Sequence, residues 1–85
     1  MLVNSAKDLA IIVRQYRKQR KLSQEAVGKS VGVKQNTVYE FENKPESTKL
    51  KTLFQILSAV GLEMRITPKG ENEKIKVKGK WQEEW

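Results

Sequence analysis

A short polar segment carries side chains whose hydrogen-bonding groups suit the edges of nucleic-acid bases. Lys34, Gln35, Asn36 and Tyr39 follow one another closely at the start of a predicted helix. A lysine can donate to guanine O6 and N7, and glutamine or asparagine amides can pair with adenine N6 and N7. Tyr39 can contact a thymine methyl group or donate to a phosphate. These four residues are the predicted base contacts.

A second set of polar residues is predicted to contact phosphates. Gln24 begins another predicted helix, where free backbone N–H groups and the side-chain amide can hold a phosphate. The Thr37 hydroxyl lies at the flank of the base-contacting residues. The remaining candidates are basic side chains on the rim of this face: Arg14, Arg17, Lys44 and Lys49. For any one of these four, an ordinary solvated charge is an equally good interpretation.

Two short helices joined at Gly32 would position these side chains. Residues 24–30 form the first helix, with Ser23 as its N-cap, and residues 34–42 form the second. Gly32 supplies the left-handed backbone of the turn. Gly28 is a poor helix former, and we expect it to let the second helix cross the first closely. This is the layout of a helix-turn-helix, whose second helix enters the DNA major groove.

Two longer amphipathic helices are predicted on either side of this pair. The first runs from an N-cap at Ser5 to about residue 19, and the last covers about 49–60. Ser47 or Thr48 is expected to cap the last helix. Apolar residues recur at helical spacing in both helices, so each has one face for a shared core.

Residues 62–67 alternate apolar and polar side chains and are followed by proline, which is the pattern of a strand. One strand in a helical chain lacks a partner, but two copies can pair antiparallel about Met64. Glu63 of one copy then faces Arg65 of the other, and such a pair contributes about 0.2–1 kcal/mol. We therefore predict a two-stranded ribbon that closes a homodimer through Leu62, Glu63, Met64, Arg65 and Ile66.

The charge distribution suits a polyanionic partner. The 85 residues carry a formal charge of +7. Residues 1–68 hold 12 Lys and Arg against 6 Asp and Glu, whereas residues 69–85 hold 5 against 4. Residues 1–68 are the predicted DNA-binding and dimerisation domain. Residues 69–85 are the predicted flexible tail.

The residue types present argue against an enzyme. The chain has no His and no Cys, which removes the commonest general base and the commonest metal ligands. We predict no catalytic residue, no cofactor and no metal site. No apolar run approaches the roughly 20 residues of a membrane span, so the expected location is the bacterial cytoplasm, at the nucleoid, with no membrane partner.

The residues around the turn resemble the Xre/Cro-type helix-turn-helix family. The matching segments are Leu22-Ser23-Gln24, Gly32-Val33, Thr37-Val38 and Phe41-Glu42-Asn43. The resemblance covers about residues 7–61. It implies an all-α, lambda repressor-like domain of four to five helices, to which this chain adds the C-terminal β-strand.

A narrower resemblance is to the HipB antitoxins of HipA–HipB toxin–antitoxin pairs. It rests on residues 32–35, 41–45, 53–57 and 62–67 and on the final Glu84-Trp85. The resemblance implies a homodimer that binds palindromic operators, represses its own operon and neutralises a HipA-like serine/threonine kinase toxin. Trp81 and Trp85 are then expected to contact the toxin, to serve as a handle for a protease, or to fold back onto the domain.

Two other functions stay open at the level of sequence. The chain could be a stand-alone phage-type Xre/Cro regulator with no toxin partner, which a neighbouring kinase gene would argue against. It could also be a helix-turn-helix module that binds protein instead of DNA. Glu40 motivates the second alternative, because phosphate would repel its carboxylate unless it points away or accepts from a cytosine amine.

Overall fold

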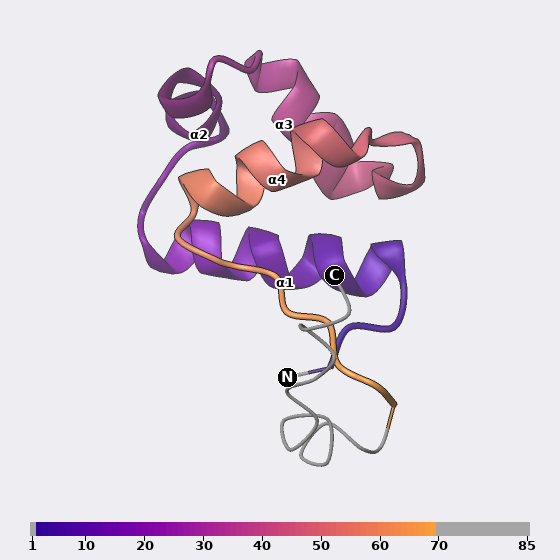
Figure 1. The fold of residues 1–85 in the computed structure, drawn as a ribbon. Coiled ribbons are helices and arrows are strands. Elements are labelled where there is room, and N and C mark those ends of the chain that lie inside the picture. Colours follow the sequence, from indigo (N-terminus) through magenta and orange to yellow (C-terminus); the bar gives the residue numbers. More distant parts are fainter. Residues whose placement is uncertain (1, 70–85) are drawn as a thin grey trace, which may run out of the picture.

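The computed structural model describes residues 2–69, which form four α-helices and one short 3-10 helix (Figure 1). The elements are α1 (Ala6–Gln19), α2 (Gln24–Val31), α3 (Gln35–Asn43), the 3-10 helix η1 (Pro45–Ser47) and α4 (Leu50–Ala59). α2 packs against both α3 and α4, while α1 packs against α3 and η1. The predicted all-α class is confirmed. No helix within residues 2–69 has the length and apolar character to cross a bilayer.

The ends of α1 and α2 follow local sequence signals. The Ser5 hydroxyl accepts from the Asp8 backbone N–H at 3.0 Å, and the Ser23 hydroxyl accepts from the Ala26 N–H at 3.0 Å. Each bond satisfies one of the free N–H groups at a helix start. Gly32 ends α2 with φ of 74°, in the left-handed region that a residue with a Cβ rarely adopts. All three predicted positions are confirmed.

The predicted cap of α4 is wrong. α4 begins after Lys49, and neither Ser47 nor Thr48 occupies the N-cap position. Pro45 starts η1, and its fixed φ favours a tight turn at this point. Ser47 is the last residue of that turn, and its hydroxyl donates to the Lys44 carbonyl at 3.2 Å instead of capping α4.

The core lies where α1, α2, α3 and α4 meet. Its buried apolar side chains are Ala10, Val13, Val27, Val38, Phe41, Leu53, Ile56, Leu57 and Val60. Within α3 the buried residues are three apart, so this helix turns one face inward and leaves the opposite face exposed. The core therefore fixes which residues of α3 can meet a partner.

Gly28 lies where the turn after α2 passes closest to that helix. A Cβ at this position would overlap the carbonyl oxygen of Val33 and crowd the carbonyl carbon of Lys34. The close approach is therefore to the backbone that leads into α3, and not to a crossing of α3 over α2 as the sequence suggested. The glycine lets the turn fold tightly against α2.

Replacing Gly28 by alanine is expected to destabilise the domain by about 1–3 kcal/mol, because the Val33 carbonyl must move to make room. This loss outweighs a gain in helix propensity of up to about 1 kcal/mol. Urea unfolding followed by circular dichroism measures the difference. Gly32→Ala is the matched control, because its new Cβ meets no atom within 4 Å and any loss comes from the positive φ alone. A Gly28→Ala protein as stable as the wild type would contradict this packing.

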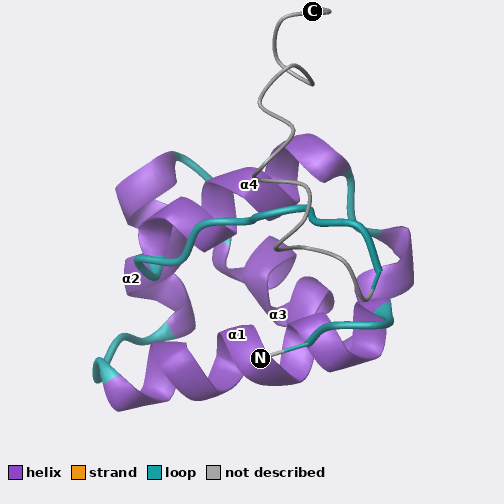
Figure 2. Cartoon of the chain, turned by 60° about the horizontal axis from the view of Figure 1, so that its bottom comes forward, coloured by secondary structure: helices purple, strands orange, loops and turns teal. Residues whose placement is uncertain are grey.

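Residues 62–68 run in an extended conformation after α4, and within residues 2–69 the single chain forms no strand. Figure 2 shows this segment as a teal loop that crosses the molecule and ends near the N-terminal residues. Glu63 and Arg65 pair with each other, with 2.9 Å between Oε2 and Nη2. Side chains two residues apart share one side of an extended chain. The ribbon requires a second copy and stays a prediction.

Candidate nucleic-acid interface

Three of the predicted base contacts lie together beside Gln24. Gln24 begins α2, Gln35 and Asn36 begin α3, and Tyr39 lies one turn further along α3. The four side chains line a shallow surface depression of about 370 Å³, which we call the amide pit. Its walls offer amide donors and acceptors together with one phenol, which is a set suited to base edges in the major groove.

The local sequence of α3 explains why this face is presented outward. Val38 and Phe41 are buried, so the residues on the other side of the helix, including Gln35 and Tyr39, are exposed. Lys34 is the exposed residue at the N-cap position, just before the helix and beside the amide pit. Its charge and the free N–H groups of the first turn make this end of α3 positive.

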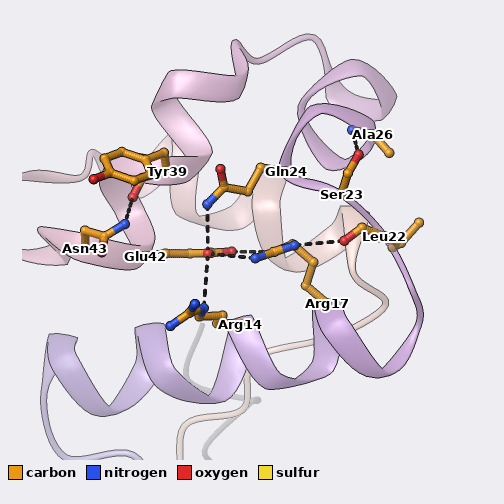
Figure 3. Close-up of polar contacts among 9 residues, drawn as sticks. All are labelled: Arg14, Arg17, Leu22, Ser23, Gln24, Ala26, Tyr39, Glu42 and Asn43. Carbon is orange, nitrogen blue, oxygen red and sulfur yellow. Dashed lines mark hydrogen bonds and ion pairs between the residues drawn. The ribbon is translucent and has the colours of Figure 1, made fainter.

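A buried ion pair joins α1 to α3 behind the amide pit. The Arg17 guanidinium donates to the Glu42 carboxylate from Nε at 2.6 Å and from Nη2 at 3.0 Å (Figure 3). Its third donor, Nη1, reaches the Leu22 carbonyl at 2.9 Å in the loop between α1 and α2. The Glu42 side chain is only 2% exposed. This fork-shaped pair fixes α3 relative to α1.

The same carboxylate also holds residues of the predicted interface. Gln24 Nε2 donates to Glu42 Oε1 at 3.0 Å, and Arg14 Nε lies 3.9 Å from the same oxygen. Figure 3 shows Gln24 and Arg14 approaching Glu42 from opposite sides. One buried group therefore connects the amide pit, the ion pair and a basic residue of α1.

The prediction that Arg17 contacts phosphate is corrected. Arg17 is 8% exposed, and Nε, Nη1 and Nη2 all donate to protein acceptors. Its basic neighbours made it look like part of a solvated face. Arg17 lies four residues after the buried Val13, and Glu42 directly follows the buried Phe41, and these spacings were the signal for an internal pair.

The other phosphate candidates occupy accessible positions. Arg14, Lys44 and Lys49 are exposed, and Thr37 is half-buried in the first turn of α3. Lys44 directly follows α3 and Lys49 directly precedes α4, so both lie near the C-terminal end of the recognition helix. Glu40 is exposed on α3. Trp81 and Trp85, predicted to bind a toxin or a protease, lie outside the described residues.

The chain is similar to known helix-turn-helix proteins over most of its described length. The model of the helix-turn-helix family matches residues 13–66. Two relatives named Antitoxin HipB, from Escherichia coli O6:H1 strain CFT073 and from Escherichia coli strain K12, are 36% identical over 64 residues. The matched segment covers 75% of this chain and 68% and 73% of the two relatives.

Solved structures of HipB share the fold. A HipB–O4 20mer complex superposes with a TM-score of 0.79 and 33% identity, covering 81% of this chain and 97% of that one. A HipA–HipB–O2–O3 complex gives the same TM-score of 0.79 and 33% identity, with the same coverage of 81% and 97%. The fold is therefore one that a relative uses in complexes of this composition.

Proposed function

The chain belongs to the helix-turn-helix family of the HipB antitoxins, and we propose that it is a sequence-specific repressor of its own operon that neutralises a HipA-type serine/threonine kinase toxin. The observation that carries the DNA-binding part is the amide pit, because four polar side chains of two helices meet at one exposed surface. Membership among the HipB antitoxins favours this function over a stand-alone regulator.

In the proposed complex, α3 lies in the major groove and its first turn contacts the bases. Lys34 donates to guanine, while Gln35 and Asn36 pair with adenine. Tyr39 contacts a thymine methyl group or a phosphate. Arg14, Thr37, Lys44 and Lys49 hold the phosphates on either side, which fixes the position of α3 without selecting a sequence. Arg17 takes no part in this contact.

The proposed repressor is a homodimer. Leu2 is 85% exposed and Ile66 is 88% exposed, which a second copy can cover. Both residues line a mostly apolar groove of about 760 Å³ that also includes Ile12, Leu57 and Met64. A dimer built on this side of the molecule can place its two recognition helices about 34 Å apart, one turn of DNA. The target is then a palindromic operator.

Reversing one charge of the extended segment is expected to weaken this dimer. Glu63→Lys places a lysine opposite Arg65 of the second copy, at two symmetric positions, and each lost pair is worth about 0.2–1 kcal/mol. We expect the dimer dissociation constant from analytical ultracentrifugation to rise by about 2- to 30-fold. The matched double swap, Glu63→Arg with Arg65→Glu, should restore part of the loss. A wild-type protein that is monomeric at micromolar concentration would refute the ribbon.

The antitoxin part of the proposal is tested in cells. The kinase encoded beside this chain is expressed alone and together with the chain, and growth and kinase autophosphorylation are measured. Co-expression is expected to restore growth and to yield a stable complex of the two proteins. Growth arrest that persists at equal expression levels would exclude inhibition of that kinase. Deleting residues 69–85 in the same assay then tests the predicted role of Trp81 and Trp85.

Repression is tested separately with a reporter gene under the promoter of the same operon. Expression of the chain is expected to lower reporter output, and scrambling the palindrome should abolish the effect. In this proposal the chain acts by binding at the nucleoid and catalyses no reaction. Reporter output that does not respond to the chain would leave the protein-interaction module as the better function.

A further inference from the structure

The amide of Gln24 has a fixed orientation. Glu42 forms an ion pair with Arg17, and an ionised carboxylate can only accept hydrogen bonds. Gln24 must therefore turn its nitrogen, the only donor of its amide, toward Glu42, as the 3.0 Å contact shows. Its carbonyl oxygen lies on the side turned away from the buried carboxylate (Figure 3). The side chain is thus held with an acceptor facing outward.

This orientation is the wrong one for a phosphate anchor. Phosphate oxygens are acceptors, so they are matched by N–H and O–H donors and repelled by an outward carbonyl oxygen. An outward acceptor in a major groove instead matches the exocyclic amines of bases, which are adenine N6 and cytosine N4. Gln24 also lines the amide pit together with Gln35 and Asn36, which places it beside the residues proposed to contact bases.

We propose that Gln24 is a specificity-determining residue that accepts a hydrogen bond from an exocyclic base amine, and that Glu42 is the positioning residue that orients it. This replaces the phosphate contact predicted from the sequence. The buried pair of Arg17 and Glu42 thereby links the packing of α1 and α3 to the choice of bases. The inference rests on the proposed function, because it requires α3 to lie in the major groove.

The test compares two duplexes and substitutes Gln24. The full-length protein is titrated, by fluorescence anisotropy at ~0.15 M salt, with its own operator and with a scrambled duplex of equal composition. Gln24→Met keeps the side-chain length and removes both polar groups. We expect about tenfold weaker binding to the operator and a change within about twofold on the scrambled duplex. Equal losses on both duplexes would show a phosphate contact and overturn the proposal.

A second variant separates the lost carbonyl from a disturbed Glu42. Gln24→Lys can still donate to the Glu42 carboxylate but offers no acceptor to the DNA. We expect its preference for the operator over the scrambled duplex to fall as far as that of Gln24→Met. A Gln24→Lys protein with the wild-type preference would mean that Gln24 acts only by supporting Glu42, which contradicts the proposed contact.

Base analogues then locate the amine. Adenines of one half-site are replaced in turn by purine, which lacks the N6 amine, and cytosines by pyrimidin-2-one, which lacks the N4 amine. One position should weaken wild-type binding but leave Gln24→Met binding unchanged, whereas amines bound by Gln35 or Asn36 should matter to both proteins. If no position loses its effect in Gln24→Met, the proposal is wrong. A wild-type protein that does not prefer its operator would instead refute the proposed function itself.

Discussion

Replacing Arg17 by alanine is expected to lower the free energy of unfolding by about 3–5 kcal/mol, because it leaves the Glu42 carboxylate buried without its charged partner. Only Gln24 and the more distant Arg14 would remain near that carboxylate. For a domain of this size each kcal/mol lowers Tm by about 4–8 °C, so a fall of more than about 12 °C is expected. Thermal unfolding followed by circular dichroism measures it.

Two controls show whether burial causes this loss. Lys29→Ala breaks an exposed pair with Glu25, whose side chains are 79% and 63% exposed and 3.9 Å apart, and should cost less than about 0.5 kcal/mol. The double variant Arg17→Met with Glu42→Leu removes both charges, and should recover most of the stability lost in Arg17→Ala. If Arg17→Ala costs no more than Lys29→Ala, the pair does not hold the helix-turn-helix together.

Replacing both Gln35 and Asn36 by alanine is expected to remove most of the preference for the operator. Each bidentate amide–adenine contact is worth about 1–3 kcal/mol, so the double variant should bind the operator about 30-fold to 10⁴-fold more weakly. Both residues are exposed, and alanine is a better helix former than either, so α3 should remain folded. Anisotropy titration with operator and scrambled duplexes measures the preference.

The matched control for this variant is Ser58→Ala, which changes an exposed polar residue of α4 outside the helix-turn-helix. Its operator affinity should equal that of the wild type. Should the Gln35 and Asn36 double variant still repress the reporter as strongly as the wild type, α3 would not be the recognition helix. The interaction-module function would then be favoured.

Local signals allowed the helices to be predicted within one or two residues of their observed ends. The Ser5 and Ser23 hydroxyls bond to N–H groups three residues away, and Gly32 adopts the left-handed conformation alone, so neither depends on distant contacts. The start of α4 was missed because Pro45 drew Ser47 into a 3-10 turn. The resemblance to HipB antitoxins is confirmed by the relatives and by the shared fold.

The site was predicted less completely because its organisation depends on contacts between helices. Gln35, Asn36 and Tyr39 were placed correctly on one surface, since their exposure follows from the buried face of α3. Arg17 and Glu42 are 25 residues apart, and no local rule distinguishes Arg17 from the exposed Arg14. The orientation of Gln24 depends on that pair and could not be inferred without it.

The most direct test is the affinity of the wild-type protein for two duplexes, the palindrome upstream of its operon and a scrambled sequence of the same composition. At ~0.15 M salt the palindrome is expected to bind at least about 10³-fold more tightly, with two chains per duplex. Equal affinity for the two duplexes would contradict sequence-specific repression by this helix-turn-helix protein.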